Sequence, residues 1–303
     1  MKTCIIILNY NNYQDTIECI KSVKQINDTE YEILVVDNCS TNESYEVLKK
    51  EACENVKVIQ TEKNLGYAGG NNVAIRYARK EGFDYICILN NDTIVDEKFL
   101  STSIEYLENH SDVAFVGPIV LDYHHGFVQS TGGNVLVNRG ETRLLNHKVN
   151  REDVGLEIEC DFIVGACLVF KTALLDDIGL IPENYFLFYE ESEWCYKARK
   201  KGYRNVCLNT TFILHKGSVS INQYEGLSAY LMARNRVIFF KRNIAAKGFR
   251  YLSFLLFLLV DTIYVMIVAD KKAWRNIPAY IDGMRNRVSE KYPFIIINEE
   301  PVN

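Results

Sequence analysis

The stretch DYICILNNDTIV, residues 84–95, decides the fold that the sequence predicts. Its apolar run at 85–89 is typical of a buried strand, and it stops abruptly at Asn90, Asn91 and Asp92 before apolar residues resume. Asparagine and aspartate favour turns, so the strand could simply end in a turn here. A strand that delivers a carboxylate to the edge of a sheet has the same pattern, and both interpretations are open at this point.

Similar apolar runs occur before this stretch and alternate with segments of helical spacing. The pattern predicts strands at 4–8, 32–36 and 56–60, and helices at 16–24, from about 43, up to about 80 and at 97–109. Continuous β-branched runs separated by helices favour a parallel sheet that is covered on both faces. We therefore predict a doubly wound, Rossmann-like α/β half over residues 1–120, with its ligand beyond the carboxyl ends of the strands.

The pattern changes in the second part of the chain. Short alternating segments with paired glycines fill residues 113–170, which predicts mixed or antiparallel sheet. Helices are predicted from about residue 172, at 192–201, and again from about residue 227. The chain is thus expected to be an α/β protein with a helical C-terminal region.

The C-terminal part is basic and contains a long apolar segment. Residues 234–291 carry 12 Lys and Arg against 4 Asp and Glu, although the whole chain has a net charge of −5. Residues 251–270 are nearly long enough to span a bilayer, but the central Asp261 would cost about 2.5–3.5 kcal/mol there. We predict an anionic membrane surface as the partner of this region and no nucleic acid; a buried, interfacial, oligomerising or spanning segment all stay open.

The nine cysteines are scattered, and no C-x-x-C pair occurs. This usage favours reduced thiols in a cytoplasmic protein over a zinc site or a disulfide framework. The N-terminal apolar run is too short for a signal peptide and is expected to form the first strand. The expected location is the cytoplasm, with peripheral contact to the inner face of the membrane as an option.

Polar residues follow the other predicted strands as well. They are Asn9, Tyr10 and Asn11 after the first strand, Asp37 and Asn38 after the second, and Asn64, Gly66, Gly69, Gly70 and Asn71 after the third. Each group alone could serve only a turn, but all lie at the same predicted sheet edge. A carboxylate at Asp37 could accept the imide N–H of a pyrimidine, and the glycines would allow a ligand to approach the backbone. The spacing is neither a dinucleotide fingerprint nor a P-loop.

Two further positions could carry chemistry. Glu190, Glu191 and Glu193 begin a predicted helix behind an aromatic run, where they could favour the helix dipole or supply a general base of raised pKa. His215 ends another apolar run, and a histidine and a carboxylate at neighbouring strand ends could share a divalent ion.

Together, the motifs resemble the inverting glycosyltransferases of family 2 with the GT-A fold, and above all the bacterial rhamnosyl- and galactosyltransferase-type members that build surface polysaccharides. The resemblance spans about residues 3–243. It is carried by VVDNCSTNES, NLGYAGGNNVAIRYA, ILNNDTIV, GACLVFKTALLDDIGLIPENYFLFYEESEWCYKARKKGYR, HKGSVS and YLMARNRVIFFKRN. It implies a GT-A catalytic domain at 1–243, with a nucleotide-binding half at 1–120 and an acceptor-binding half at 121–243. Residues 244–303 would then be a basic helical region that contacts a membrane or forms an oligomer.

The resemblance also implies roles for individual residues. Asp92 would hold Mg²⁺ or Mn²⁺, with His215 as a second ligand, and Glu191 would be the catalytic base, with Glu190 as its rival. Asn90 replaces the first acid of the family's D-x-D element, and Glu191 stands where an aspartate is usual. Donor-binding roles would fall to Asn9, Tyr10, Asn11, Asp37, Asn64, Gly66, Asn71, Asn90, Asn91, Gly165, Ala166 and Arg234.

The implied reaction moves a sugar from a UDP- or dTDP-linked donor to a hydroxyl of a glycan or lipid-linked glycan acceptor, in bacterial surface polysaccharide synthesis. Two alternatives stay open. A sugar nucleotidyltransferase would need a glycine-rich, Arg- or Lys-bearing loop after the first strand, where the sequence is LNYNNYQD. A degenerate glycosyltransferase kept as a membrane-bound assembly partner would not need Asp37, Asp92, Glu191 and His215 intact.

Overall fold

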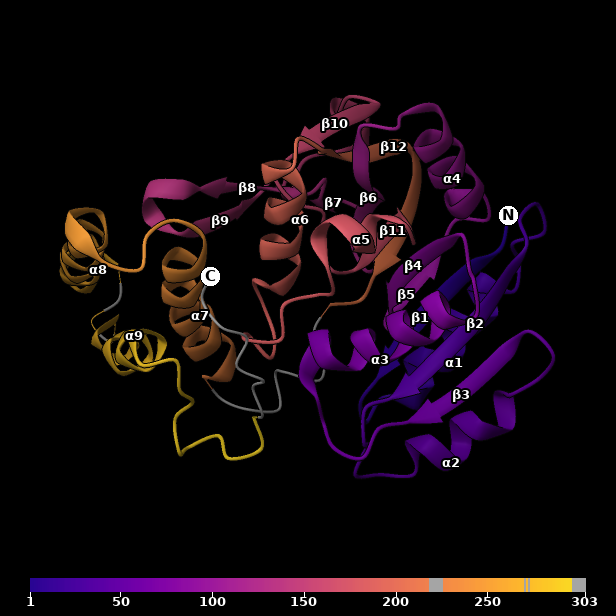
Figure 1. The fold of residues 1–303 in the computed structure, drawn as a ribbon, viewed down its shortest axis with the longest axis horizontal. Coiled ribbons are helices and arrows are strands. Elements are labelled where there is room, and N and C mark those ends of the chain that lie inside the picture. The colour runs from indigo at the N-terminus through magenta and orange to yellow at the C-terminus, as the bar shows by residue number, and fades with distance from the viewer. Residues whose placement is uncertain (218–225, 270, 272, 296–303) are drawn as a thin grey trace.

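The computed structural model describes residues 1–217, 226–269, 271 and 273–295 of the 303-residue chain (Figure 1). Outside the described residues lie residues 218–225, which include the last three residues of the HKGSVS motif, and residues 270, 272 and 296–303. The strands are β1 Thr3–Asn9, β2 Tyr31–Asp37, β3 Val56–Gln60, β4 Tyr85–Asn90, β5 Thr93–Val95, β6 Val113–Asp122, β7 Val128–Ser130, β8 Gly133–Leu136, β9 Glu141–Leu144, β10 Glu157–Cys160, β11 Cys167–Lys171 and β12 Arg204–His215. The α-helices are α1 Tyr13–Val23, α2 Ser44–Leu48, α3 Gly66–Lys80, α4 Phe99–Asn109, α5 Leu174–Ile178, α6 Glu190–Lys200, α7 Leu227–Asn243, α8 Gly248–Val268 and α9 Asn276–Met284.

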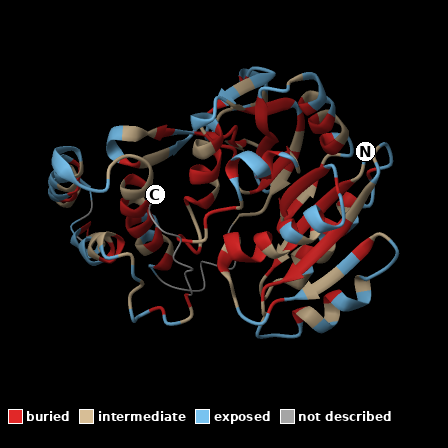
Figure 2. Cartoon of the chain, in the orientation of Figure 1, coloured by how far each residue is buried: buried red, intermediate tan, exposed pale blue. Residues whose placement is uncertain are grey.

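The first half is the predicted parallel sheet with helices on both faces. Strands β3, β2, β1 and β4 pair in parallel in that order. Alternate residues of β1 enter two different cores: Ile6 packs with Ala74 and Ile75 of α3, whereas Ile5 and Ile7 pack with α1 and α4. Both faces of each central strand are therefore buried, which is why these strands are continuously apolar (Figure 2).

The second half continues the same sheet with mixed strand directions. β11 pairs antiparallel with β4 and β6, and β12 runs parallel to β6, giving the order β10-β12-β6-β11-β4-β1-β2-β3. β12 also pairs antiparallel with the short β5. The predicted change of pattern after residue 113 is thus confirmed, and the two expected halves share one sheet.

The glycine-rich segment after β3 differs from the expectation of a turn. α3 begins at Gly66, so Gly69 and Gly70 lie inside the helix. A Cβ on Gly70 would come within 2.5 Å of the Leu8 side chain, and one on Gly69 within 2.7 Å of Leu65. These two glycines allow close packing of α3 within the protein, and only Gly66 lines the cavity described below.

The C-terminal helices lie beside the sheet rather than on it (Figure 1). α7 packs against α6 through Phe239, and α9 and α8 pack on α7. Among the described residues, α8 is the one helix with the length and apolar composition to cross a membrane, and most of it is exposed. Asp261 of α8 forms an ion pair with Arg236 of α7, so its charge points towards the protein body.

Candidate active site

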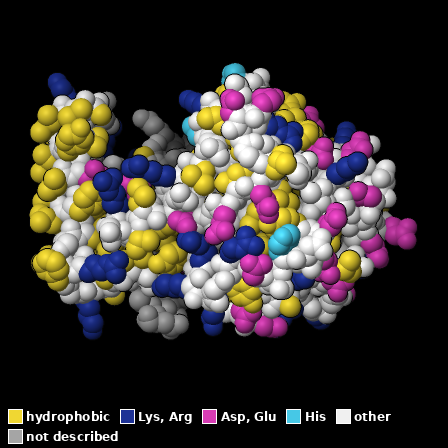
Figure 3. Space-filling model, turned by 90° about the horizontal axis from the view of Figure 1, so that it is seen from above, with side chains coloured by type: hydrophobic (Ala, Val, Ile, Leu, Met, Phe, Trp, Pro, Cys, Tyr) yellow, Lys and Arg dark blue, Asp and Glu magenta, His cyan; other side chains and the backbone are white. Residues whose placement is uncertain are grey.

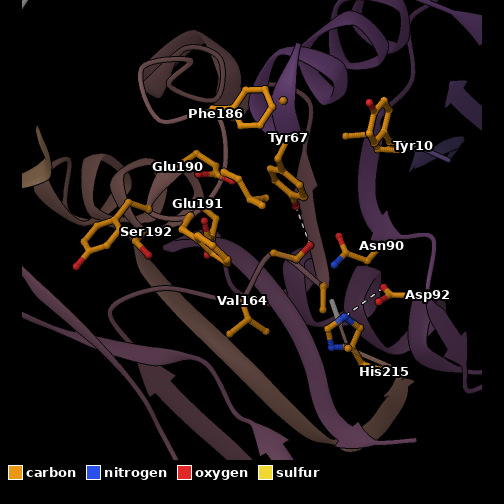
Figure 4. A pocket seen from close by; sticks show the side chains of 18 of the residues that line it. Tyr10, Tyr67, Asn90, Asp92, Val164, Phe186, Glu190, Glu191, Ser192 and His215 are labelled. Atoms are coloured by element: carbon orange, nitrogen blue, oxygen red, sulfur yellow. Dashed lines mark hydrogen bonds and ion pairs between the residues drawn. The ribbon is translucent and has the colours of Figure 1, made fainter. Parts of the chain in front are cut away.

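A cavity of about 720 Å³ lies at the carboxyl ends of the parallel strands, as the fold class predicts. It is bounded by the ends of β1 and β4 on one side and by the segment before α6 on the other. Figure 4 shows Glu190 and Glu191 across this cavity from Asp92 and His215. The sequence-predicted residues that line it are Tyr10, Asn64, Gly66, Asn90, Asn91, Asp92, Gly165, Ala166, Glu190, Glu191 and His215.

Asp92 and His215 meet because of strand pairing. Asp92 lies in the short link between β4 and β5, and His215 pairs with Thr93 in the β5–β12 register. Asp92 Oδ1 lies 3.2 Å from His215 Nε2. His215 Nδ1 donates a hydrogen bond of 2.5 Å to Gln129 Oε1, which leaves Nε2 as the ring nitrogen that faces the carboxylate.

This pair has the donor set of a divalent metal site. Asp92 Oδ1 is buried and has no hydrogen-bond partner within the described residues, and a carboxylate oxygen 3.2 Å from an imidazole nitrogen is a pair of ligand atoms that divalent cations bind. The Gln129 contact orients the imidazole as a supporting group does in metal sites. No group of three or more potential His, Cys, Asp or Glu ligands occurs in the described part of the chain. A metal here would therefore need oxygen ligands from water or from a bound diphosphate.

Glu190 and Glu191 begin α6 after a strained backbone segment. Phe186, Phe188 and Tyr189 all have positive φ values, between 69° and 77°. Such conformations cost energy, persist where the surroundings hold them, and are concentrated at functional sites. The segment turns the first residues of α6, and with them both carboxyl groups, to the cavity.

The environment of α6 separates the pKa values of its three acids. Burial, together with the charge of Glu191, raises the pKa of Glu190 well above its ordinary value, and Glu190 Oε2 has no hydrogen-bond partner in the described part of the chain. Burial raises the pKa of Glu191 to about 7. Burial would also raise the pKa of Glu193, but hydrogen bonds and charge from Arg242 outweigh it and the pKa is lowered. Glu191 is thus the carboxyl group that changes protonation near neutral pH.

Several predicted donor-binding residues are buried beside the cavity instead of lining it. The Asp37 carboxylate accepts hydrogen bonds from Asn9 Nδ2 at 2.7 Å, from the amide and hydroxyl of Ser40, and from Gln60. Asn11 is tied to the same turn through Ser40. Asp37 therefore organises the turn after β2, and its contact with a base stays a prediction. Asn71 is fully buried and donates to Tyr67 O.

Arg234 is not brought into the cavity either. Its side chain is fully buried, and its guanidinium donates to Arg287 O and Asn184 O. The next residue, Asn235, donates to the carbonyl oxygens of Tyr185, Leu187 and Phe188. Arg234 and Asn235 of α7 therefore hold the backbone segment that leads into Glu190, which gives them a positioning role beside the cavity.

Tyr67, Gln129 and Asn38 line the cavity but were missing from the predicted site. Tyr67 Oη donates a 2.7 Å hydrogen bond to Gly165 O, which joins α3 to the segment before β11. Asn38 joins the end of β2 to Gly66 O. Tyr67 lies within the quoted glycine motif, and Asn38 was noted at the end of the second strand without a role in binding. Gln129 lies in a three-residue strand without a sequence signal.

Gly66→Ala is expected to destabilise the protein and disturb the site. Gly66 has φ +68°, and an added Cβ would lie 2.4 Å from the carbonyl oxygen of Phe186, the atom that accepts a hydrogen bond from Tyr67 N. Gly82→Ala is the matched control, since Gly82 has φ +74° and no atom within 4 Å of its added Cβ. Gly66→Ala should lose about 2 kcal/mol more unfolding free energy than Gly82→Ala in urea denaturation. Equal losses would contradict the close contact.

The chain matches known proteins over most of its length. A family model described as Glycosyl transferase family 2 matches residues 4–179. The low-salt glycan biosynthesis hexosyltransferase Agl10 of Haloferax volcanii is 25% identical over 301 residues, covering 94% of this chain and 92% of that protein.

Two solved structures share the fold. GalNAc-T7, crystallised with UDP, GalNAc and Mn²⁺, has a TM-score of 0.65 at 13% identity, covering 80% of this chain and 48% of that one. A mannosyltransferase of Pyrobaculum calidifontis in complex with GDP-Man and Mn²⁺ has a TM-score of 0.58 at 15% identity, covering 96% of this chain and 77% of that one. The family match, the sheet order and the cavity at the strand ends agree with each other. The chain therefore belongs to glycosyl transferase family 2 and is a glycosyltransferase of the GT-A fold that takes its sugar from a nucleotide-sugar donor.

Proposed function

We propose that this enzyme transfers a sugar, with inversion, from a UDP- or dTDP-linked donor to a hydroxyl of a glycan or lipid-linked glycan acceptor in surface polysaccharide synthesis. The observation that carries the proposal is the presence of Glu191, with its pKa near 7, in the same cavity as the Asp92–His215 pair. The hexosyltransferase Agl10, named for glycan biosynthesis, supports this class of reaction. The intact set of cavity carboxylates and His215 argues against a degenerate enzyme.

The proposed reaction is a single displacement at the anomeric carbon. The acceptor oxygen attacks that carbon while the bond to the β-phosphate oxygen breaks, and the electron pair leaves with the nucleoside diphosphate. Glu191 accepts the proton of the attacking hydroxyl. One carboxylate base is enough, because attack from the face opposite the leaving group needs no covalent intermediate. Burial and the charge of Glu191 raise the pKa of Glu190 well above its ordinary value, which disfavours a second negative charge in this part of the cavity.

Asp92 and His215 would hold Mg²⁺ or Mn²⁺ beside the diphosphate. A divalent ion there supplies charge that stabilises the leaving phosphate oxygens. Asn90, in place of an acid, lines the cavity through an uncharged side chain, so Asp92 supplies the negative charge at this strand end. The proposed site thus depends on Asp92 more than a site with two acids would.

The acceptor side of the cavity is apolar and aromatic. Phe186, Leu187 and Phe188 line it together with Met232 and Phe294 from the C-terminal part of the chain. Aromatic and apolar side chains pack well against sugar faces and lipid chains. This wall supports a glycan or a lipid-linked glycan as the acceptor.

We assign residues 1–243 to the catalytic domain, and the free state of all nine cysteines supports a cytoplasmic location.

The proposed base predicts a specific pH dependence. Glu191 accepts a proton only when ionised, and burial raises its pKa from 4.5 to about 7. The kcat/KM for transfer should therefore rise with pH through about 7 and fall about tenfold for each pH unit well below it. A pH–rate profile measured at saturating Mn²⁺ checks this. A rising limb centred near 4.5 would show an unperturbed carboxylate and would contradict the assignment.

The proposed donor class is tested by thermal stabilisation. Nucleoside diphosphates and their sugars are screened against the full chain with Mn²⁺ and with a chelator, and release of the nucleoside diphosphate is then measured for those that bind. We expect uridine or thymidine diphosphate sugars to raise the melting temperature in the presence of Mn²⁺, because ligand binding to the folded state stabilises it. Stabilisation by no nucleotide sugar would contradict the proposal.

A further inference from the structure

The outer face of α8 is apolar along its whole length. We call Phe249, Leu252, Leu256, Ile263, Tyr264 and Ile267 the α8 face; each is between 49% and 87% exposed. Figure 3 shows hydrophobic side chains gathered over this edge of the molecule, with Lys and Arg side chains nearby. Contiguous exposed apolar side chains of this extent mark an interaction site in a folded protein.

The inner face fixes α8 to the protein. The ring of Phe254 stacks on that of Phe240 of α7, with 3.8 Å between centroids, and Leu258 and Thr262 are buried. Asp261 points inward, 3.7 Å from Arg236. A helix that crossed a membrane would have to give up these contacts and carry Asp261 into the hydrocarbon. The contacts therefore favour a helix that stays on the body and presents one face over about 30 Å.

The charges around α8 identify the kind of partner. Lys247 and Arg250 are exposed at its start, and Lys271 and Arg275 are exposed beyond its end. Within the described residues of 244–295, Glu290 is the one exposed acid. A second copy fits poorly, because either direction of pairing along α8 would bring basic ends against basic ends. An anionic surface complements both ends at once.

We infer that the α8 face docks the enzyme flat on an anionic lipid bilayer. The apolar side chains would enter the boundary between headgroups and acyl chains, and the flanking Lys and Arg would contact lipid phosphates. Tyr264 and the exposed Trp274 suit the same depth, since aromatic side chains with a polar atom favour the membrane interface. This inference goes beyond the proposed reaction and does not depend on the donor, the acceptor or the catalytic base.

Vesicle flotation of the full chain tests the inference. Wild type should float with vesicles of phosphatidylcholine and phosphatidylglycerol, less with pure phosphatidylcholine, and less again at high salt. The double variant Leu256→Glu/Ile263→Glu should bind at least about tenfold more weakly, because two inserted side chains become charged. Leu156→Glu is the matched control, an apolar residue that is 69% exposed outside the C-terminal helices, and it should bind like wild type.

Charge reversal separates the contribution of the flanking Lys and Arg from that of the apolar side chains. Lys247→Glu/Arg275→Glu should lose the preference for anionic vesicles while keeping the melting temperature of wild type. Equal flotation of wild type and Leu256→Glu/Ile263→Glu would overturn the inference. A second outcome would also overturn it. If wild type binds neither kind of vesicle but forms a dimer, and Leu256→Glu/Ile263→Glu dissociates that dimer, the α8 face is an interface between copies of the chain.

Discussion

Glu191→Gln is expected to lower kcat for sugar transfer by about a hundred- to ten-thousandfold, the range that a general base contributes. Glutamine keeps the shape of the side chain but cannot take the proton of the acceptor hydroxyl. Donor binding should be unchanged, because the proposed diphosphate site lies across the cavity at Asp92 and His215. Single-turnover transfer rates and donor affinity by calorimetry, measured on the same preparation, check both parts.

Glu190→Gln is the matched control for this prediction. Burial and the charge of Glu191 raise the pKa of Glu190 well above its ordinary value, which favours the neutral acid. An amide there therefore changes little in charge, and transfer should stay within about tenfold of wild type. A raised carboxyl pKa in the folded state means that ionisation destabilises the fold as pH rises from 4.5 past 7. Relative to wild type, Glu191→Gln should therefore gain stability over that range, which shows that it is folded. If Glu190→Gln loses transfer while Glu191→Gln keeps it, the catalytic base is Glu190 and the assignment to Glu191 is wrong.

Asp92→Asn is expected to weaken Mn²⁺-dependent binding of the nucleoside diphosphate by at least about a hundredfold, because a metal site loses its one charged ligand. The His215 and Gln129 side chains stay in place, so the change is confined to charge. Titration calorimetry of uridine diphosphate, with Mn²⁺ and with a chelator, measures the loss directly.

Asp96→Asn is the control for the metal prediction. Asp96 lies four residues further along, does not line the cavity, and accepts hydrogen bonds from Thr211 and the Lys98 amide. It should bind the nucleotide like wild type. If the Mn²⁺ dependence survives in Asp92→Asn, the Asp92–His215 pair is a structural ion pair and the proposed metal site is wrong.

The sequence was sufficient to predict the parallel half and the position of the cavity. Strands buried on both faces are continuously apolar, so β1, β2 and β4 stand out in the sequence, and their polar ends must share one edge of the sheet. Asp92 and His215, which follow or end apolar runs, were predicted for this reason, whereas Glu191 was singled out by the family resemblance. Gly69 and Gly70 were misinterpreted, because a glycine that allows a helix to pack closely looks the same in sequence as one that admits a ligand.

Other features depend on contacts between distant residues. The resemblance implied donor contacts for Asp37 and Arg234. In the structure, the Asp37 carboxylate accepts hydrogen bonds from Asn9, Ser40 and Gln60, and Arg234 donates to backbone carbonyl oxygens of other segments. The three positive-φ residues before α6 have no glycine to mark them. Asn235, which donates to the carbonyl oxygens of Tyr185, Leu187 and Phe188 in this segment, lies about 50 residues away. The direction of Asp261 was likewise open until its ion pair with Arg236 placed it.

The anomeric configuration of the newly transferred sugar tests the proposed mechanism most directly. The glycosidic bond fixes this configuration, and proton NMR of the product reports it through the coupling of the anomeric proton. A single displacement with Glu191 as base predicts the configuration opposite to that of the donor. A retained configuration would contradict the account, since it requires two displacements or attack on the face of the leaving group.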